Sequence, residues 1–357
     1  MTPTETGPKA FVARQSERIG LWSLLGVCLV VIAVGAGWVT GALATLVTIL
    51  GLVVVVAFIW AAIMSDTETR RRLAPYGLLK PGMLFLSLFF LAPLWIMLST
   101  SLAKRDDPLD FQPKFAWHFQ NYRDAFHDFG PQFQRAFAYS AIATVLCILI
   151  GYPLAYVIAF RGGKYKNLLL GLVVIPFFTS YLIRTLAWQS ILADQGPVVS
   201  SIKKLHLVGV FEFFHLMEDG RILSTASAVI GGLTYNFLPF MILPIYVSLE
   251  KIDLRLVDAA KDLYSGTGRA FRRVVLPLSL PGLFAGTLLT FIPAAGDFVN
   301  AAFLGGPNNT MIGNSIQDQY LNQVNYPLAS AMSFVLMGII TVAVLIYTRL
   351  LGTEELT

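Results

Sequence analysis

Charged residues are scarce in this sequence. Only 13% of its 357 residues are Asp, Glu, Lys or Arg, whereas 56% are apolar and the mean hydropathy is +0.67. So little charge excludes a disordered chain, which stays unfolded because it is polar and self-repelling. So much apolar surface excludes a water-soluble domain, because a soluble fold has to present a polar exterior. The composition therefore predicts an integral membrane protein.

Cysteine and histidine are also rare. Cys28 and Cys147 both lie inside apolar runs, which excludes a disulfide framework between outer loops and indicates packing positions. The four His residues fall in predicted outer loops without the paired spacing of a metal site: His118, His127, His206 and His215. We therefore expect no metal and no cofactor on this chain.

A phosphate-binding loop is absent as well. The pattern GxxxxGK[ST] does not occur, and the nearest Gly-containing fragments, 162–165 and 266–269, lack its spacing and its Ser or Thr. That loop supplies the backbone amides, the Lys and the hydroxyl that hold ATP and Mg²⁺. We therefore expect no catalytic residue here and no ATP hydrolysis by the chain itself.

Long apolar runs are what the sequence does contain. A membrane-spanning helix needs about 20 mostly apolar residues, and eight runs meet that length: 19–39, 42–64, 82–101, 136–160, 167–192, 223–248, 279–300 and 327–349. The first run follows a basic start, as in a signal peptide, but it is long and a second run follows directly. We expect both to be retained as a helical hairpin. The predicted fold is all-α and integral to the membrane, with six core transmembrane helices after this extra N-terminal hairpin.

The distribution of Lys and Arg predicts the orientation. Seventeen of the 26 such residues flank one side of the predicted spans, and eight flank the other. Because cytoplasmic flanks accumulate these residues, we expect both termini in the cytoplasm. The net charge of +5 comes from Lys and Arg that flank the predicted spans on the cytoplasmic side. Insertion in a lipid bilayer therefore explains this charge, and no nucleic-acid partner is needed.

Polar segments divide the chain into predicted parts. A basic, Pro-containing linker separates the hairpin from the core, whose loops alternate between long outer and basic inner segments. The parts are a cytoplasmic N-terminus (1–18), the transmembrane hairpin (19–64), a basic cytoplasmic linker (65–81), the six-span core (82–350) and a cytoplasmic tail (351–357).

The sequence also predicts the structure of two outer segments and of the helices that contain proline. Segment 102–135 is expected to be a short helical cap or an ordinary surface loop. Segment 301–326, rich in amides, fits a loop that dips toward the bilayer, with its turn at 305–307. Each interior proline removes a backbone hydrogen bond, which predicts kinked or locally unwound helices at Pro93, Pro153, Pro176, Pro239, Pro244, Pro277, Pro281 and Pro293.

The longest inner loop, 253–277, has more pattern than a simple connection needs. Its first part fits about three helical turns, with Leu254, Val257 and Ala260 on one stripe. Two glycines, at 266 and 268, are expected to break this helix, and 269–275 to restart it with basic residues toward solvent or a partner. Pro277 is expected to end the element before the next span. The pattern indicates a docking surface.

This loop resembles the EAA loop of the permease subunits of ABC importers. Asp258, Ala259 and Ala260 stand at the Glu-Ala-Ala positions, and Leu276 with Pro277 stands at the Leu-Pro near its end. Tyr264 occupies the place of the usual turn glycine, so we expect Gly266 to move the turn two residues later. The resemblance implies that this loop couples to an ATPase subunit through Asp258, Ala259, Ala260, Leu263, Gly266, Leu276 and Pro277.

Five further segments resemble the PotB-like spermidine/putrescine permease family: 176–192, 236–253, 296–307, 311–314 and 326–337. The resemblance covers roughly residues 80 to 350. It implies a type I ABC importer permease fold, multi-pass in the cytoplasmic (inner) membrane of a prokaryote, with an EAA-like coupling loop at 253–277. It also implies a polyamine cargo and the following partners: two ABC ATPase subunits that use ATP and Mg²⁺, a second homologous permease subunit, and an extracytoplasmic solute-binding protein.

A polyamine carries ammonium groups on a chain of methylenes, so its pathway should offer sparse carboxylates and aromatic faces. Asp297 is the main candidate, because an acid within the membrane is costly without a function. The alternative is a structural Asp that caps a broken helix or pairs with Arg184. Tyr235 and Asn236 line the pathway or simply pack, and Trp188 stacks on substrate or belongs to the interfacial aromatic belt. Arg184 is expected to pair with a carboxylate or with helix-end carbonyls.

Other functions stay open at this stage. Related permeases import iron, thiamine, opines or phosphonates, so the same architecture could serve another small solute. An ion-coupled secondary transporter is a rival from another class, although no inverted repeat is visible and such a carrier has no use for a docking loop. A channel or a membrane scaffold would leave the prolines and the loop without a role.

Overall fold

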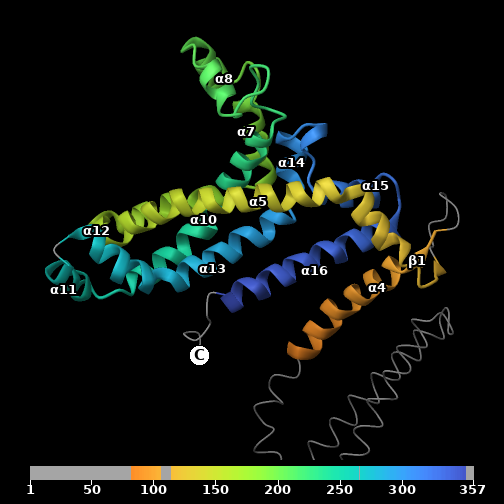
Figure 1. The fold of residues 1–357 in the computed structure, drawn as a ribbon, viewed down its shortest axis with the longest axis horizontal. Coiled ribbons are helices and arrows are strands. Elements are labelled where there is room, and N and C mark those ends of the chain that lie inside the picture. The colour runs from red at the N-terminus through yellow and green to blue at the C-terminus, as the bar shows by residue number, and fades with distance from the viewer. Residues whose placement is uncertain (1–81, 106–113, 265, 351–357) are drawn as a thin grey trace, which may run out of the picture. The chain divides into compact units, whose positions relative to one another are not determined.

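The computed structural model describes residues 82–105, 114–264 and 266–350 (Figure 1). The chain divides into two compact units, with the boundary after Phe119. The predicted N-terminus (1–18), hairpin (19–64), linker (65–81) and tail (351–357) lie outside the described residues, as does Cys28.

The described residues of the first unit form one helix of spanning length, Gly82–Ser101, which confirms the apolar run predicted there. Its middle is a π-helical turn, η1 (Ser87–Leu91), and its end is α4 (Ala92–Ser101). The wider π turn directly precedes Pro93, which has no N–H to donate and pushes on the preceding turn. A short antiparallel pair, β1 (Ala103–Lys104) and β2 (Lys114–Phe115), follows.

The second unit is a bundle of long helices. It is built on α5 (Gln120–Arg161), α10 (Ala226–Glu250), α13 (Leu276–Ala295) and α16 (Tyr326–Leu350). Figure 1 shows them running alongside one another, and α10 packs most extensively against α5 and α13. The predominantly helical membrane fold predicted from the sequence is thus confirmed for the described residues.

Small residues allow these helices to approach closely. The buried stripe of α5 repeats every three or four positions and consists mostly of small side chains: Ala136, Ser140, Ala143, Cys147, Gly151 and Ala155. On α13, a Cβ at Gly282 would lie 2.4 Å from the carbonyl oxygen of Pro244 on α10. Membrane helices associate largely through such close packing, because lipid offers them little hydrophobic driving force.

The predicted span 167–192 is not one straight helix. The structure places two helical segments there, Gly163–Phe178 and Tyr181–Lys204, which meet at an angle of 93°. The first segment comprises η2 (Gly163–Tyr165), α6 (Lys166–Val174) and η3 (Ile175–Phe178); the second comprises α7 (Tyr181–Leu192) and α8 (Pro197–Lys204).

The break between them has a local cause. Pro176 stands at the start of the tighter turn η3, and Thr179 at its end is extended, with φ −82° and ψ 148°. The sequence prediction of an unwound helix near Pro176 is therefore confirmed, although the size of the bend was not predicted. The described residues contain five helices of spanning length, or six if the bent pair is one span.

The outer segments are more helical than expected. Because α5 begins at Gln120, the second half of segment 102–135 extends a long helix instead of forming a separate cap. Between α8 and α10 lies the short helix α9 (Val208–Phe213). Segment 301–326 is not an irregular loop but contains the end of α14 (Val299–Leu304), η5 (Pro307–Asn309) and α15 (Ile312–Leu321). Its amides serve as helix caps: the Asn314 side chain accepts from the Met311 N–H at 3.1 Å and donates to the Phe298 carbonyl at 2.7 Å.

Candidate functional site

A buried polar cluster lies where α7, α10 and the turn between α13 and α14 meet. The Tyr181 hydroxyl donates to Asp297 Oδ1 at 2.7 Å, and the backbone N–H of Asn300 donates to Asp297 Oδ2 at 2.8 Å. Asn300 Nδ2 also contacts Asp297 Oδ2 at 3.1 Å and the Tyr181 hydroxyl at 2.6 Å. Asn236 Nδ2 donates to Asn300 Oδ1 at 3.1 Å and lies 3.4 Å from Thr185 Oγ1. We call these five residues the Asp297 cluster.

The cluster is shielded from solvent. Asp297 is 8% exposed, Asn236 1%, and Thr185 and Asn300 0%. Both carboxylate oxygens of Asp297 have donors, one of them the N–H in the first turn of α14, so this residue caps a broken helix as the structural alternative predicted. A capped carboxylate inside a polar network is a stable way to hold one negative charge in a buried place.

Two glycines permit this arrangement. A Cβ at Gly232 on α10 would lie 2.4 Å from Leu304 Cδ1 and 2.7 Å from Asn300 Oδ1. A Cβ at Gly313 on α15 would lie 2.9 Å from the carbonyl oxygen of Gly296 and 3.0 Å from that of Asp297. At Gly313 the added atom would meet backbone, so the backbone at 296–297 depends on glycine there. At Gly232 it would meet the side-chain ends of Leu304 and Asn300, so these two side chains would have to move.

Arg184 lies beside the cluster but does not pair with a carboxylate. Its side chain is buried, and no ion pair with it occurs among the described residues. The guanidinium instead lies over two rings, with its Cζ 5.3 Å from the centroid of Phe177 and 5.6 Å from that of Tyr181. Of the two predicted partners of Arg184, a carboxylate or helix-end carbonyls, the carboxylate is therefore wrong for the described residues: the guanidinium lies over the ring of Tyr181, and it is the hydroxyl of Tyr181 that contacts Asp297.

The two aromatic candidates form a pair of their own. Trp188 and Tyr235 meet edge to face, with ring centroids 5.2 Å apart. Tyr235 is 36% exposed, and no hydrogen bond links either residue to the Asp297 cluster among the described contacts. Their geometry offers an aromatic wall between α7 and α10.

Three members of the cluster, Tyr181, Thr185 and Asn300, were not singled out from the sequence. Tyr181 and Asn300 are 119 positions apart, so no local pattern connects them. The usable signal was the density of polar residues in two apolar runs: Tyr181 and Thr185 flank Arg184 within one helical turn, and Asn300 follows Asp297 by three positions.

The loop 253–277 forms a helical hairpin at one end of the bundle (Figure 1). Helix α11 (Leu254–Tyr264) packs against α12 (Thr267–Ala270) and the π turn η4 (Phe271–Val275). Val257 and Ala260 are buried, as the predicted stripe requires, so Ala260 packs within the chain itself. The outward face shows Leu256 and Leu263, which are 52% and 79% exposed, with exposed Ala259 between them. Asp258 is exposed beside this face.

The turn of this loop lies where the sequence predicts it. Helix α11 continues through Tyr264, and Gly266 is extended with φ −169° and ψ 131° before α12 begins. Gly268 does not break the helix, because it lies inside α12, where an added Cβ would meet nothing within 4 Å.

The expectation that Pro277 ends the element is wrong. One helix runs from Thr267 to Ala295. Pro277 is in the first turn of α13, and η4 ends two residues before it, which repeats the arrangement at Pro93. The widened turn accommodates the proline ring, so the helix continues. Leu276 beside it packs against the core around α5 and α10.

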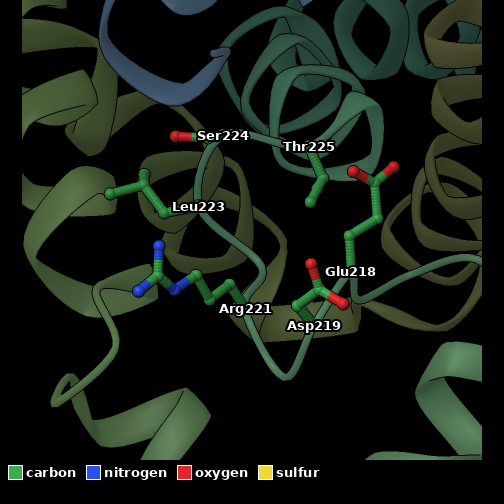
Figure 2. A pocket seen from close by; sticks show the side chains of 6 residues that line it. All are labelled: Glu218, Asp219, Arg221, Leu223, Ser224 and Thr225. Carbon is green, nitrogen blue, oxygen red and sulfur yellow. The ribbon is translucent and has the colours of Figure 1, made fainter.

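An open surface pocket of about 420 Å³ lies on the segment before α10, lined by Glu218, Asp219, Arg221, Leu223, Ser224 and Thr225 (Figure 2). Figure 2 shows the carboxylates of Glu218 and Asp219 on one side and the Arg221 guanidinium on the other. Arg221 Nε pairs with Asp194 Oδ2 at 3.1 Å, and both side chains are largely exposed. None of the predicted pathway residues lines this pocket.

Comparison with known proteins shows the family. Residues 127–351 match the family of binding-protein-dependent transport system inner membrane components. The spermidine/putrescine transport system permease protein PotB of Haemophilus influenzae is 38% identical over 266 residues, which cover 74% of this chain and 90% of that protein. PotB of Escherichia coli K12 is 35% identical over 269 residues, which cover 74% of this chain and 93% of that protein.

Solved structures agree on the fold. A bacterial ABC transporter involved in the import of the acidic polysaccharide alginate aligns with a TM-score of 0.56 at 16% identity, covering 82% of this chain and 97% of that chain. At this identity the likeness concerns the fold alone. The type I permease fold predicted from the sequence is confirmed in its helical core. The chain belongs to the family of binding-protein-dependent transport system inner membrane components, and it is a multi-pass inner-membrane component of an ABC transporter.

Proposed function

We propose that this chain is the permease subunit of an ATP-driven importer that moves spermidine or putrescine into the cell. The observation that carries the proposal is the 38% identity to a spermidine/putrescine permease over 90% of that protein's length. The family match over residues 127–351 includes both the loop 253–277 and the segment around Asp297.

In this proposal the chain is not itself an enzyme and binds no cofactor. Two ABC ATPase subunits hydrolyse ATP with Mg²⁺, a second homologous permease subunit completes the pathway, and an extracytoplasmic solute-binding protein delivers the polyamine. Both termini and loop 253–277 face the cytoplasm, which agrees with the excess of Lys and Arg on that side.

The coupling surface is the outward face of α11. Leu256, Ala259 and Leu263 recur at helical spacing and form an exposed apolar stripe on an otherwise polar helix. Asp258 borders this stripe and Gly266 sets the turn that presents it, while Ala260 holds α11 against its own loop. An ATPase subunit that covers the stripe would move α11 and α12 as it closes.

The substrate pathway passes the junction of α7, α10 and α14. Asp297 supplies the negative charge there, Asn236 an amide, and Trp188 with Tyr235 an aromatic wall for the methylenes and ammonium groups. Because the carboxylate is already held by donors, it attracts a cation without the high affinity of a bare charge, which suits a site that has to release its cargo.

Transport by the complete complex tests this function. The chain, its partner subunits and the binding protein are reconstituted in proteoliposomes, and ATPase activity and uptake are measured with spermidine, putrescine, thiamine, ferric iron, an opine and a phosphonate. We expect stimulation by polyamines alone, and uptake that needs ATP and survives an uncoupler. Stimulation by another solute without response to polyamines would refute the cargo, and uptake that collapses with the uncoupler would refute the ATP-driven mechanism.

A further inference from the structure

Arg184 is a buried cation for which the described residues offer no ion pair. Its side chain is 8% exposed, and its Nε finds no hydrogen-bond acceptor there. A guanidinium stays charged at physiological pH, and a buried charge without a hydrogen-bonded counter-ion is costly. Packing alone does not explain why a charged side chain is buried at this position, since its burial costs free energy.

Arg184 is connected to a negative charge, the carboxylate of Asp297, only through the side chain of Tyr181. The guanidinium of Arg184 lies over the ring of Tyr181, and the hydroxyl of the same Tyr181 donates to Asp297. Cation and carboxylate are therefore joined through a phenol and not by direct contact. The junction as a whole holds one positive and one negative side chain.

The groups around Arg184 are those that an alkylammonium ion would use. Aromatic faces attract cations, and the rings of Phe177 and Tyr181 are occupied by the guanidinium. Asn236, which is 1% exposed, also has a carbonyl oxygen without a donor in the described structure. A buried acceptor left unpaired is unusual in a native fold, and an ammonium N–H would satisfy it.

The position of Arg184 also links this chemistry to the bend. Phe177 belongs to η3, before the break, whereas Arg184 belongs to α7, after it. Their contact therefore bridges the two arms of the 93° bend. Removal of the guanidinium from the Phe177 ring would release one connection across the break.

We propose that Arg184 is a resident cation: it occupies the aromatic faces of Phe177 and Tyr181 while no substrate is present, and it yields them to an ammonium group of the cargo. Exchange of one cation for the other loosens the bend, so that cargo entry and movement of α7 are linked. Arg184 is thus a positioning residue for transport. The inference rests on the proposed polyamine function.

Binding of radiolabelled spermidine to the complete complex in nanodiscs tests the exchange. Arg184→Gln removes the competing charge, so we expect spermidine to bind roughly tenfold more tightly, while uptake slows because release is impaired. Arg184→Lys keeps a cation and is expected to restore near-wild-type affinity. Co-purification of the partner subunits shows whether each variant is assembled.

If Arg184 has only a structural role, Arg184→Gln should not tighten spermidine binding. Spermidine binding by an assembled Arg184→Gln complex that is unchanged or weaker than wild type would overturn the resident-cation proposal. If Gln does not assemble, Phe177→Leu carries the test: it removes one of the aromatic faces that the ammonium group takes over, so spermidine binding should weaken. Unchanged spermidine binding by an assembled Phe177→Leu complex would overturn the proposal. A wild-type complex that neither binds nor transports any polyamine would refute the proposed function, and with it this inference.

Discussion

The loop 253–277 and the Asp297 cluster are both polar parts of an apolar chain, but they are built in different ways. The loop is one continuous stretch whose residues contact mainly each other, with α11 lying against α12 and η4. The cluster takes its members from α7, α10 and the turn before α14, and its longest link joins residues 119 positions apart. One is exposed and the other is almost fully buried.

This difference predicts which property a substitution should change in each region. A change in the exposed face of the loop should alter an interaction with a partner and leave the chain itself folded. A change in the cluster should alter the packing of three helices together with any cargo contact, because its hydrogen bonds join α7 to Asp297 and α10 to α14. Five variants test this distinction, given from the largest expected effect to the smallest.

Asp297→Asn should have the largest effect. The amide keeps the size of the side chain but loses the charge, and its NH₂ group would face one of the donors that now bind the carboxylate. We expect spermidine uptake to fall on the order of 100-fold. Asp318→Asn, whose carboxylate accepts from Asn322 at the end of α15, is the control and should stay within about twofold of wild type. Equal uptake by wild type and Asp297→Asn would remove the cluster from the pathway.

The double variant Leu256→Asp and Leu263→Asp should disable the loop without unfolding it. Both leucines are exposed, so the cost falls on the interface and not on the chain. We expect the ATPase subunits to co-purify roughly 30-fold less efficiently, as for two central apolar contacts of an interface. Leu205→Asp, a 66% exposed leucine in the predicted outer segment, is the matched control and should leave co-purification unchanged. Normal co-purification of the double variant would place the docking surface elsewhere.

Gly232→Ala and Gly231→Ala form a pair on adjacent residues of α10. The added methyl group at 232 meets Leu304 and Asn300, whereas the one at 231 meets nothing within 4 Å. We expect Gly232→Ala to lower stability by about 1–3 kcal/mol and to reduce uptake with it. Gly231→Ala should be neutral or stabilising by up to about 1 kcal/mol. Thermal unfolding in detergent compares them, and equal melting temperatures would show that α14 can move away from α10.

Tyr181→Phe removes only the hydroxyl that links α7 to Asp297. The ring and its contact with Arg184 remain, while one carboxylate oxygen loses its donor. We expect a loss of about 1 kcal/mol in stability and a several-fold fall in uptake, measured in proteoliposomes. Thr341→Val, which also removes a hydroxyl from a helix but far from any cluster residue in sequence, serves as control. A fall as large as that of Asp297→Asn would show that Tyr181 contacts cargo directly.

Lys166→Gln should have the smallest effect. Lys166 Nζ lies 2.7 Å from Glu250 Oε1 and joins the start of α6 to the end of α10, but both side chains are partly exposed. Such ion pairs contribute about 0–1 kcal/mol. Uptake should therefore stay within about twofold of wild type, and a larger loss would extend the coupling region beyond loop 253–277.

Much of the fold followed from the sequence because membrane helices obey local rules. Apolar length placed the spans at 82–101, 223–248 and 327–349 close to the observed helices. Prediction failed where the outcome depended on how the chain meets a proline: Pro176 accompanies a 93° break, whereas Pro93 and Pro277 each follow a π turn and the helix continues. The removal of one N–H is the same in all three places, so the neighbouring turn decides the result.

The two functional regions were predictable to different degrees for the same reason. The helix, the turn at Gly266 and the buried stripe of the loop could be inferred because they depend on spacing within 25 residues. Asp297 was found because an acid in an apolar run is conspicuous, but its partner Tyr181 was not, since Tyr181 comes from another helix. The predicted pairing of Arg184 with a carboxylate was wrong because the sequence does not show that the guanidinium lies over an aromatic ring.

The unbroken helix Thr267–Ala295 gives the two regions a mechanical relation. It begins in the loop, directly after Gly266, and ends two residues before Asp297. At 1.5 Å per residue it extends about 40 Å, which is enough to cross the hydrocarbon core of a bilayer. In the proposed mechanism, an ATPase subunit that pushes on α12 would therefore shift the position of Asp297 through this one continuous helix.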